Sequence, residues 1–229
     1  MGTPVLIVGD GQMGLVMAAA ALEAGHRRVS VWGPFAESVA ELHATRESPR
    51  LPGWRIPEGI ELTSDLAVFE DAEVLVNAIP TQFVRPVWRR IREADRTGAA
   101  SVVVSTAKGL EVGSGLRPTE ILHELMPTLE PCVLSGPTIA TELARRQPAV
   151  MIAACRSADL VHDVHRTFGT PWLRIYEGAD LLGVELAGAL KNVIAIAAGI
   201  CDGLELGFNA KSALLARGLA EMSRFGVAL

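Results

Sequence analysis

The sequence contains few cysteines. Only Cys132, Cys155 and Cys201 occur among its 229 residues, and their spacing matches no metal-binding or redox motif. An odd, unpatterned set of cysteines is typical of a protein kept in a reducing compartment. The N-terminus also lacks the basic start, long apolar stretch and cleavage site of a secretory signal. These absences exclude a small disulfide-held protein and predict a cytoplasmic location.

Basic residues are not in excess either. The chain has 21 lysines and arginines against 26 acidic residues, a net charge of -5, with both signs spread along it. Nucleic-acid binding through a basic field is therefore not expected. Residues 193–200, the most apolar later stretch, are too short to span a bilayer and are predicted to form a buried helix. We expect a folded, soluble protein without a membrane span.

Short apolar runs rich in valine and isoleucine alternate with segments of helical spacing, such as residues 15–24 and 83–94. This alternation predicts an α/β protein with a Rossmann-like, mainly parallel sheet and helices on both faces. Between residues 132 and 153 an antiparallel edge strand is an alternative that the pattern leaves open. The predicted strands are residues 5–8, 29–32, 74–79, 102–105, 132–134, 150–153 and 172–176.

The character of the sequence changes near Gly178, where strand signals stop and a helical pattern rich in alanine, leucine and glycine begins. We therefore predict two domains, residues 1–178 and residues 179–229, the second all-helical. About fifty residues are few for an independent helical domain. The second part is expected to be only the first helices of a longer domain.

A glycine-rich loop follows the first predicted strand. Gly9, Gly11 and Gly14 form G-x-G-x-x-G between that strand and a helix. Gly9 permits a tight turn, Gly11 lets the backbone approach a pyrophosphate, and Gly14 lets the helix pack near the strand. A tight turn without a ligand is the simpler alternative, but strand, spacing and helix together favour a dinucleotide. The second strand ends without an acid for the ribose, so the choice between NAD and NADP stays open.

Two lysines are candidates for substrate contact. Lys108 follows the fourth predicted strand, at the sheet edge where ligands of α/β proteins bind, although a solvated loop lysine would look the same. Lys191 shares a helix face with small residues, including Gly188 and Ala195, against which a ligand could approach closely. Burial on such a face would make Lys191 a proton acceptor, whereas a lysine snorkelling to water is the alternative.

Two further segments carry weaker signals. Thr138 precedes a predicted helix over residues 139–146 and could cap it, or the helix start could bind an anion. His162 and His165 are spaced i, i+3 and could begin a metal site. The sequence places no third ligand near them, so a surface helix is the better interpretation and no metal site is predicted.

Taken with these features, the sequence resembles the NAD(P)-dependent glycerol-3-phosphate dehydrogenases of the soluble bacterial type over nearly its whole length. Three segments look like family signatures, and two more continue in register with the family. The signature segments are residues 103–111, 134–143 and 183–199, and the continuing ones are residues 209–215 and 217–222.

The resemblance implies an oxidoreductase that reduces dihydroxyacetone phosphate to sn-glycerol 3-phosphate, which feeds phospholipid synthesis. It implies that Lys191 is the catalytic base and also binds substrate, together with Lys108, Gly136 and Thr138. It also implies NAD or NADP as cofactor. The implied cofactor-binding residues are Gly9, Gly11, Gln12, Met13, Gly14, Phe83, Lys108 and Ala140.

The sequence departs from the family pattern at one point. The family continues with a Gly-Leu-Gly-Asp segment and a Ser-Arg-Asn segment, which supply an acid near the catalytic lysine and an arginine for the substrate phosphate. We therefore expect these 229 residues alone to be inactive and to self-associate, or to have poorly ordered final helices. The alternatives are a non-catalytic dinucleotide-binding module and a related dehydrogenase acting on another small hydroxy acid.

Overall fold

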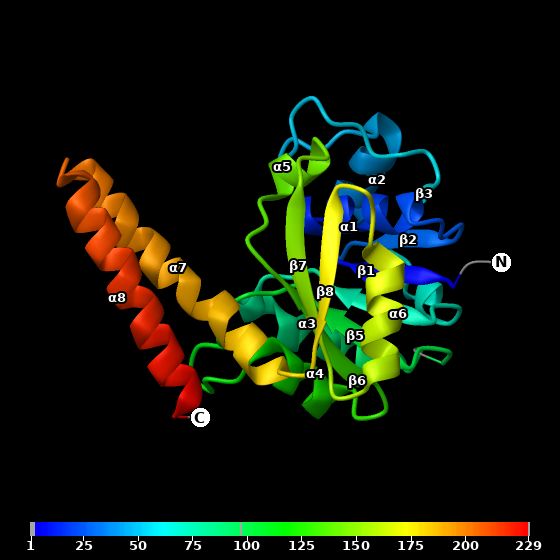
Figure 1. The fold of residues 1–229 in the computed structure, drawn as a ribbon. Helices are drawn as coiled ribbons and strands as arrows, with labels where there is room; N and C mark the ends of the chain where they lie inside the picture. Colours follow the sequence, from blue (N-terminus) through cyan, green and yellow to red (C-terminus); the bar gives the residue numbers. More distant parts are fainter. Residues whose placement is uncertain (1–2, 97, 229) are drawn as a thin grey trace.

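The computed structural model describes residues 3–96 and 98–228, and its centre is one eight-stranded sheet (Figure 1). The strand order is β3-β2-β1-β4-β5-β6-β7-β8. The strands are β1 (Val5–Val8), β2 (Val29–Trp32), β3 (Ile60–Thr63), β4 (Val74–Asn77), β5 (Val102–Ser105), β6 (Glu130–Ser135), β7 (Ala149–Ala154) and β8 (Leu173–Gly178). The helices are α1 (Gln12–Glu23), α2 (Ala36–Thr45), α3 (Thr81–Ala94), α4 (Pro118–Leu125), α5 (Ala140–Ala144), α6 (Ala158–Phe168), α7 (Leu181–Gly203), α8 (Gly207–Val227) and a short 3-10 helix, Leu66–Phe69.

Side chains alternate across the sheet and build a hydrophobic core on each face. Val5 and Ile7 of β1 join one core with residues of α1, α2, α5 and α6, whereas Leu6 and Val8 join the other with residues of α3 and α4. Strands buried on both faces need continuous apolar runs, which the valine-rich segments supply. The predicted α/β class with helices on both faces is confirmed.

Direction along the sheet changes once. The strands from β3 to β6 are parallel, β7 runs antiparallel to β6, and β8 is parallel to β7. The alternative of an antiparallel strand within residues 132–153 is therefore correct. It is not the edge strand, because β8 lies beyond it.

The edge strand β3 was not predicted from the sequence. It has only four residues, of which Ile60 and Leu62 face the core. Two apolar positions after a loop rich in proline and glycine give too little pattern for a strand to be recognised. Residues 60–63 are recognised as a strand only from their parallel pairing with β2 in the structure.

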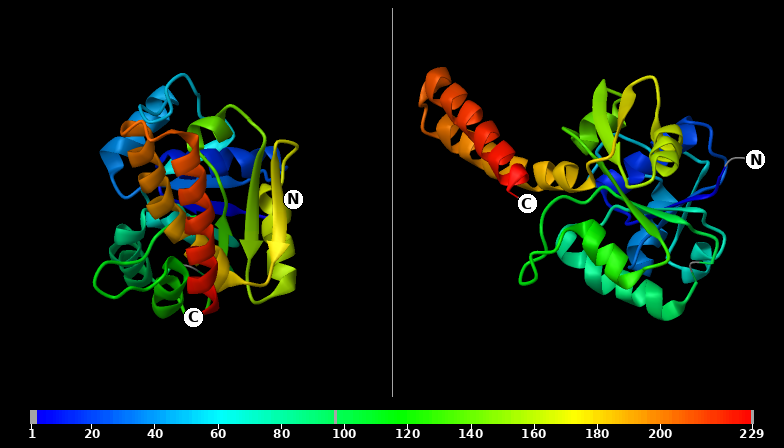
Figure 2. Two further views of the ribbon diagram at one scale, coloured as in Figure 1. Left: turned by 60° about the vertical axis from the view of Figure 1, so that its left-hand side comes forward. Right: turned by 60° about the horizontal axis from the view of Figure 1, so that its bottom comes forward.

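Helices α7 and α8 pack against each other and project away from the sheet (Figures 1 and 2). The prediction of a buried helix over residues 193–200 is wrong, because Val193 is 62% exposed and Ile196 is 67% exposed. Among the described residues, this half of α7 packs against α8. By length and hydropathy α7 could also cross a membrane, since it has 23 residues, although a helix of a soluble protein can pass the same test. The predicted boundary after residue 178 falls in the joint between β8 and α7 and stays a prediction.

Candidate active site

The glycine loop between β1 and α1 is built as the spacing predicts. Gly9 has a φ of +123°, which favours glycine, and a Cβ there would lie 2.9 Å from the carbonyl oxygen of Ala78. A Cβ on Gly14 would lie 2.0 Å from the carbonyl oxygen of Gly9. Both glycines are therefore required by close backbone packing inside the protein.

Gly11 differs from these two glycines. A Cβ built on it would meet none of the described residues within 4 Å, so the space above it is open. Gly11 is also the N-cap of α1 and has no side chain to satisfy the free N–H groups of the first turn, where Gln12 and Met13 lie. An open backbone cradle at a helix start fits the pyrophosphate of a dinucleotide.

An acid lies at the end of β2, although the sequence places none there. Asp10 belongs to the glycine loop, but its carboxyl carbon is 2.8 Å from the position that a Cβ on Gly33 would take, directly after β2. The hydroxyl of Ser38, in the first turn of α2, donates to Oδ2 of Asp10 at 3.3 Å. The basic residues before β2 lie at the opposite end of the strand, where Arg28 is paired with Asp71 at 2.8 Å.

The loop after β5 is held by the first turn of α3. The Thr81 hydroxyl donates to the carbonyl oxygen of Lys108 at 2.9 Å, and the Gln82 side chain donates to the carbonyl oxygen of Leu110 at 2.8 Å. Gly109 has a φ of +124°, which lets the chain turn beside Lys108. The first turn of α3 thus fixes the backbone of the Lys108 loop at the carboxyl edge of the sheet.

The two lysines lie close enough for their charges to interact. Burial lowers the pKa of Lys108, and the positive charge of Lys191 lowers it further. Helix α7 approaches this loop at Gly188, where a Cβ would be 3.7 Å from Cγ of Lys108 and 2.9 Å from Oγ of Ser135. Lys191 lies one helical turn after Gly188 and is half-buried. Two neighbouring positive charges at the carboxyl edge of the sheet can attract an anionic ligand.

Glu185 fixes α7 in this position. Its buried carboxylate accepts from the Thr119 backbone N–H at 3.0 Å and from the Arg117 guanidinium at 2.9 Å. The Thr119 hydroxyl donates to it as well. Burial raises the pKa of Glu185, while the two donor residues act in the opposite direction. The start of α4 therefore anchors the helix that carries Lys191.

A cavity of about 680 Å³ lies between α7, α8 and the end of β6. Gly136 borders it, and a Cβ there would lie 2.4 Å from the carbonyl oxygen of Val150, so the approach of β7 already requires this glycine. Other lining residues are Ser135, Asp180, Gly183, Ala187, Gly188, Lys191 and Met222.

Three other predicted site residues have definite positions. Thr138 does not cap α5: the N-cap is Ile139, and the Thr138 hydroxyl faces the carbonyl oxygen of Gly136 at 3.4 Å. The helix begins one residue later than a Thr138 cap requires. Ala140 is buried in the core at the start of α5. Phe83 is 60% exposed on α3, so it does not pack inside the protein.

Comparison with known proteins assigns both parts of the chain. Residues 4–161 match the family model described as the N-terminus of NAD-dependent glycerol-3-phosphate dehydrogenase, and residues 180–229 match that of its C-terminus. The chain belongs to the NAD-dependent glycerol-3-phosphate dehydrogenase family.

Relatives and solved structures agree with this family. Glycerol-3-phosphate dehydrogenase [NAD(P)+] of Chlorobium luteolum is 39% identical over 98% of this chain and 68% of the relative, and that of Rhodospirillum rubrum is 40% identical over 98% and 64%. The crystal structure of glycerol-3-phosphate dehydrogenase from Coxiella burnetii matches 99% of this chain and 69% of its own, with a TM-score of 0.91 and 31% identity. The resemblance inferred from the sequence is thereby confirmed.

Within this dehydrogenase fold, three residues that were not predicted as site residues position the site. Thr81 and Gln82 hold the Lys108 loop, and Glu185 holds α7. Glu185 carries the one recognisable signal, an acid among the apolar and small residues of the lysine helix. Such an acid needs a partner when it is buried.

Proposed function

We propose that this chain contributes the cofactor-binding and lysine-bearing parts of an NAD(P)-dependent sn-glycerol-3-phosphate dehydrogenase. The reaction is reduction of dihydroxyacetone phosphate to sn-glycerol 3-phosphate, a small-molecule conversion in the cytoplasm that supplies phospholipid synthesis. The observation that carries the proposal is that the open cradle at Gly11 and the loop of Lys108 follow the carboxyl ends of β1 and β5, two parallel strands of one sheet, and that Lys191 lies close enough for its charge to act on Lys108. Similarity to the named relatives supports it.

The residues of the first domain fit a dinucleotide. Gly9 and Gly14 shape the loop, and Gly11 with Gln12 and Met13 presents backbone N–H groups to the phosphates. We assign Phe83, Lys108 and Ala140 to the neighbourhood of the cofactor on the family resemblance. When bound in its reduced form, the nicotinamide supplies the hydride.

The lysines supply charge and a proton. As hydride reaches C2 of the substrate, the C=O π bond opens and the oxygen takes a proton from the Lys191 ammonium; in the reverse reaction the neutral amine accepts it. Lys108 adds a second positive charge for the anionic substrate, and we assign Gly136 and Thr138 to the same subsite. Residues 1–178 then form the dinucleotide domain and residues 179–229 the first helices of the substrate domain.

The cradle at Gly11 gives the most direct test. Gly11→Val places a side chain where the pyrophosphate backbone contact forms, so binding of reduced cofactor should be lost, as measured by titration of its fluorescence. Gly98→Val is the matched control, because a Cβ on Gly98 also meets no described residue within 4 Å and this turn lies outside the site. Equal affinity of Gly11→Val and the unaltered chain would refute the cofactor site.

A further inference from the structure

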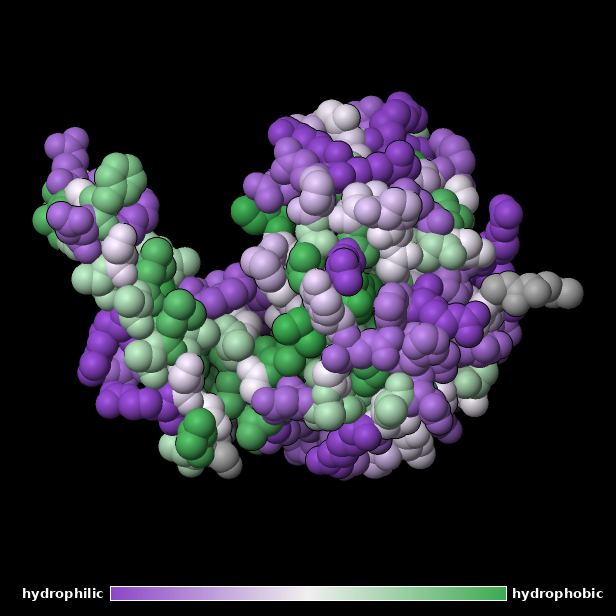
Figure 3. Space-filling model, viewed as in Figure 1, coloured by the Kyte–Doolittle hydropathy of each residue, from purple (hydrophilic) through white to green (hydrophobic). Residues whose placement is uncertain are grey.

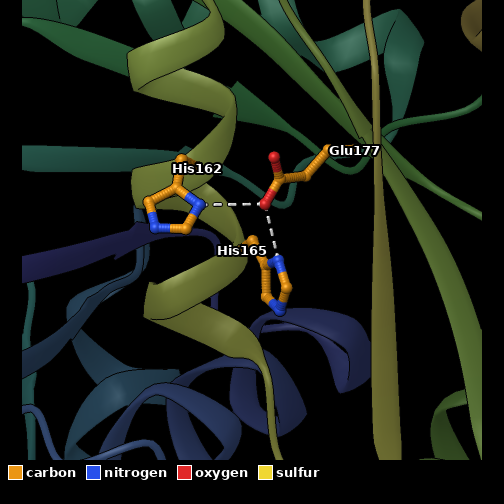
Figure 4. Close-up of side chains that lie close together, drawn as sticks. All are labelled: His162, His165 and Glu177. Carbon is orange, nitrogen blue, oxygen red and sulfur yellow. Dashed lines mark hydrogen bonds and ion pairs between the residues drawn. The ribbon is translucent and has the colours of Figure 1, made fainter.

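Two histidines and one glutamate meet where α6 packs beside β8 (Figure 4). Nδ1 of His162 lies 3.0 Å and Nδ1 of His165 lies 2.7 Å from the same oxygen, Oε1 of Glu177. A carboxylate oxygen only accepts, so both ring nitrogens donate in this arrangement. Two protons therefore point at one oxygen.

The fold creates this cluster from two separate patterns. Helix α6 buries Val161 and Val164 against the sheet, and the histidines each follow one of these residues, so they share one flank of the helix. On β8, Leu173 and Ile175 alternate toward the core, and Glu177 continues that alternation. The third donor that the sequence does not place near the histidines is thus brought in by β8.

We propose that His162, His165 and Glu177 bind a divalent transition-metal ion of the zinc class. Their donor atoms all lie within 4.8 Å of one another. Donors on a tetrahedral zinc ion, at about 2.0–2.2 Å from the metal, are about 3.3–3.6 Å apart. The Nδ1–Oε1 distances of 3.0 Å and 2.7 Å therefore need to lengthen by less than about 1 Å to admit the ion. Two imidazole nitrogens and one carboxylate suit zinc or cobalt rather than magnesium or calcium.

Exposure allows the ion and a completing water molecule to reach the cluster. The side chains of His162, His165 and Glu177 are 59%, 42% and 39% exposed. A bound metal takes the place of the two Nδ1 protons, and each imidazole then carries its one proton on Nε2. The bound ion would connect α6 to β8 at Glu177, three residues before Asp180, the N-cap of α7. Its role would be to stabilise the connection between β8 and α7.

The test is calorimetric titration of Zn²⁺ into protein that carries no histidine tag and has been stripped with a chelator. We expect one Zn²⁺ per chain, and His165→Gln should weaken binding by about 100-fold or more, since even outer-shell changes cost 10–100-fold. Zn²⁺, but not Mg²⁺, should raise the Tm of the unaltered chain. His123→Gln, at an exposed histidine of α4, is the matched control and should bind Zn²⁺ normally.

Two outcomes would overturn the metal site. One is equal Zn²⁺ affinity of His165→Gln and the unaltered chain. The other is loss of binding in Cys201→Ser, which would assign the ion to the half-buried cysteine of α7 instead. Because all three proposed ligands are at least partly exposed, the variants should fold, and circular dichroism verifies this before titration.

Asp10 supports a second inference, which rests on the proposed function. Its carboxylate lies against Gly33 at the end of β2, where an acid in a dinucleotide site accepts a hydrogen bond from the ribose. The geometry points to selection of NAD(H) over NADP(H) by Asp10. A 2′-phosphate at this place would meet a negative charge, and Arg28 is at the opposite end of the strand.

Fluorescence titration with both reduced cofactors tests this selection. The unaltered chain should bind NADH more tightly than NADPH, and Asp10→Asn, which keeps the size of the side chain, should shift the affinity ratio toward NADPH by about tenfold or more, since like charges in contact are strongly unfavourable. Glu37→Gln is the control, because Glu37 is the exposed acid in the first turn of α2.

The two proposals fail in different ways. If neither cofactor binds, the proposed function itself fails. If NADH and NADPH bind equally and Asp10→Asn leaves their ratio unchanged, the cofactor site stands and the role of Asp10 is refuted. A shift in Glu37→Gln alone would assign the selection to α2.

Discussion

Lys191 is the residue on which the proposed chemistry depends. In a form of the protein that turns over dihydroxyacetone phosphate, Lys191→Ala should lower kcat by about 100-fold or more while cofactor affinity is retained, because a general acid–base group contributes on that scale. The rate is followed by oxidation of the reduced cofactor. Lys211→Ala is the control, since the Lys211 ammonium is paired with Asp202 at 2.6 Å on the distal part of the helical hairpin. Near-normal turnover of Lys191→Ala would mean that another group moves the proton.

Individual site residues were predictable from sequence to different degrees. Gly9 and Gly14 of the first loop follow from spacing, because each has a steric reason that the structure reproduces, whereas Gly11 borders open space. Asp10 could not be assigned to the end of β2, since its side chain reaches there only through the three-dimensional approach of the β1 loop to Gly33. For the same reason Glu177 could not be paired with His162 and His165: strand and helix meet only after folding.

At the scale of elements, the contact between α7 and α4 decides where the lysine helix lies. Glu185→Ala should lower the free energy of unfolding by about 3 kcal/mol, because it leaves Arg117 and the Thr119 N–H without their buried acceptor. Glu185→Gln keeps an acceptor and should cost about 1 kcal/mol. Urea denaturation measures both, with Glu93→Ala on exposed α3 surface as the control. Equal stability of Glu185→Ala and the control would refute the anchor.

The pH dependence of this anchor has a defined sign. Burial raises the pKa of Glu185 in the folded protein above the ordinary glutamate value of 4.5. Its contribution to stability is therefore full below about pH 4.5 and is lost as the pH rises through the folded pKa. The stability difference between the unaltered chain and Glu185→Gln should shrink over that interval. A constant difference would show that the carboxyl group titrates alike in both states.

Strands with continuous apolar runs were predicted with the correct bounds, whereas short elements with few apolar positions were not. The valine-rich strands β1, β2 and β5 have their predicted bounds, since burial on both faces demands uninterrupted apolar residues. Strand β3 and the start of α5 depend on pairing and on close backbone approach, which no local pattern records. The direction of β7 likewise follows from its pairing with β6.

At the scale of the whole molecule, the helical hairpin leaves apolar surface uncovered. Green hydrophobic residues follow α7 and α8 where these helices project from the sheet (Figure 3). The sequence pattern of α7 looked like that of a core helix, but hydropathy alone does not say which element covers it. The large apolar side chains exposed on the two helices are Val193, Ile196, Ile200, Phe208, Leu215, Leu219, Phe225 and Val227.

A contiguous apolar patch of several hundred square ångströms is uncommon on a soluble monomer, so we expect this chain to self-associate through the hairpin. Light scattering coupled to size exclusion should give a mass that rises with protein concentration, and Ile196→Glu with Ile200→Glu should return it to that of a monomer. Val112→Glu, at a valine that is more exposed than either isoleucine but lies on the loop between β5 and α4, should leave association unchanged. If the chain is monomeric at every concentration, the prediction that α7 and α8 mediate self-association is wrong. If only Val112→Glu disrupts the oligomer, association runs through the sheet domain instead.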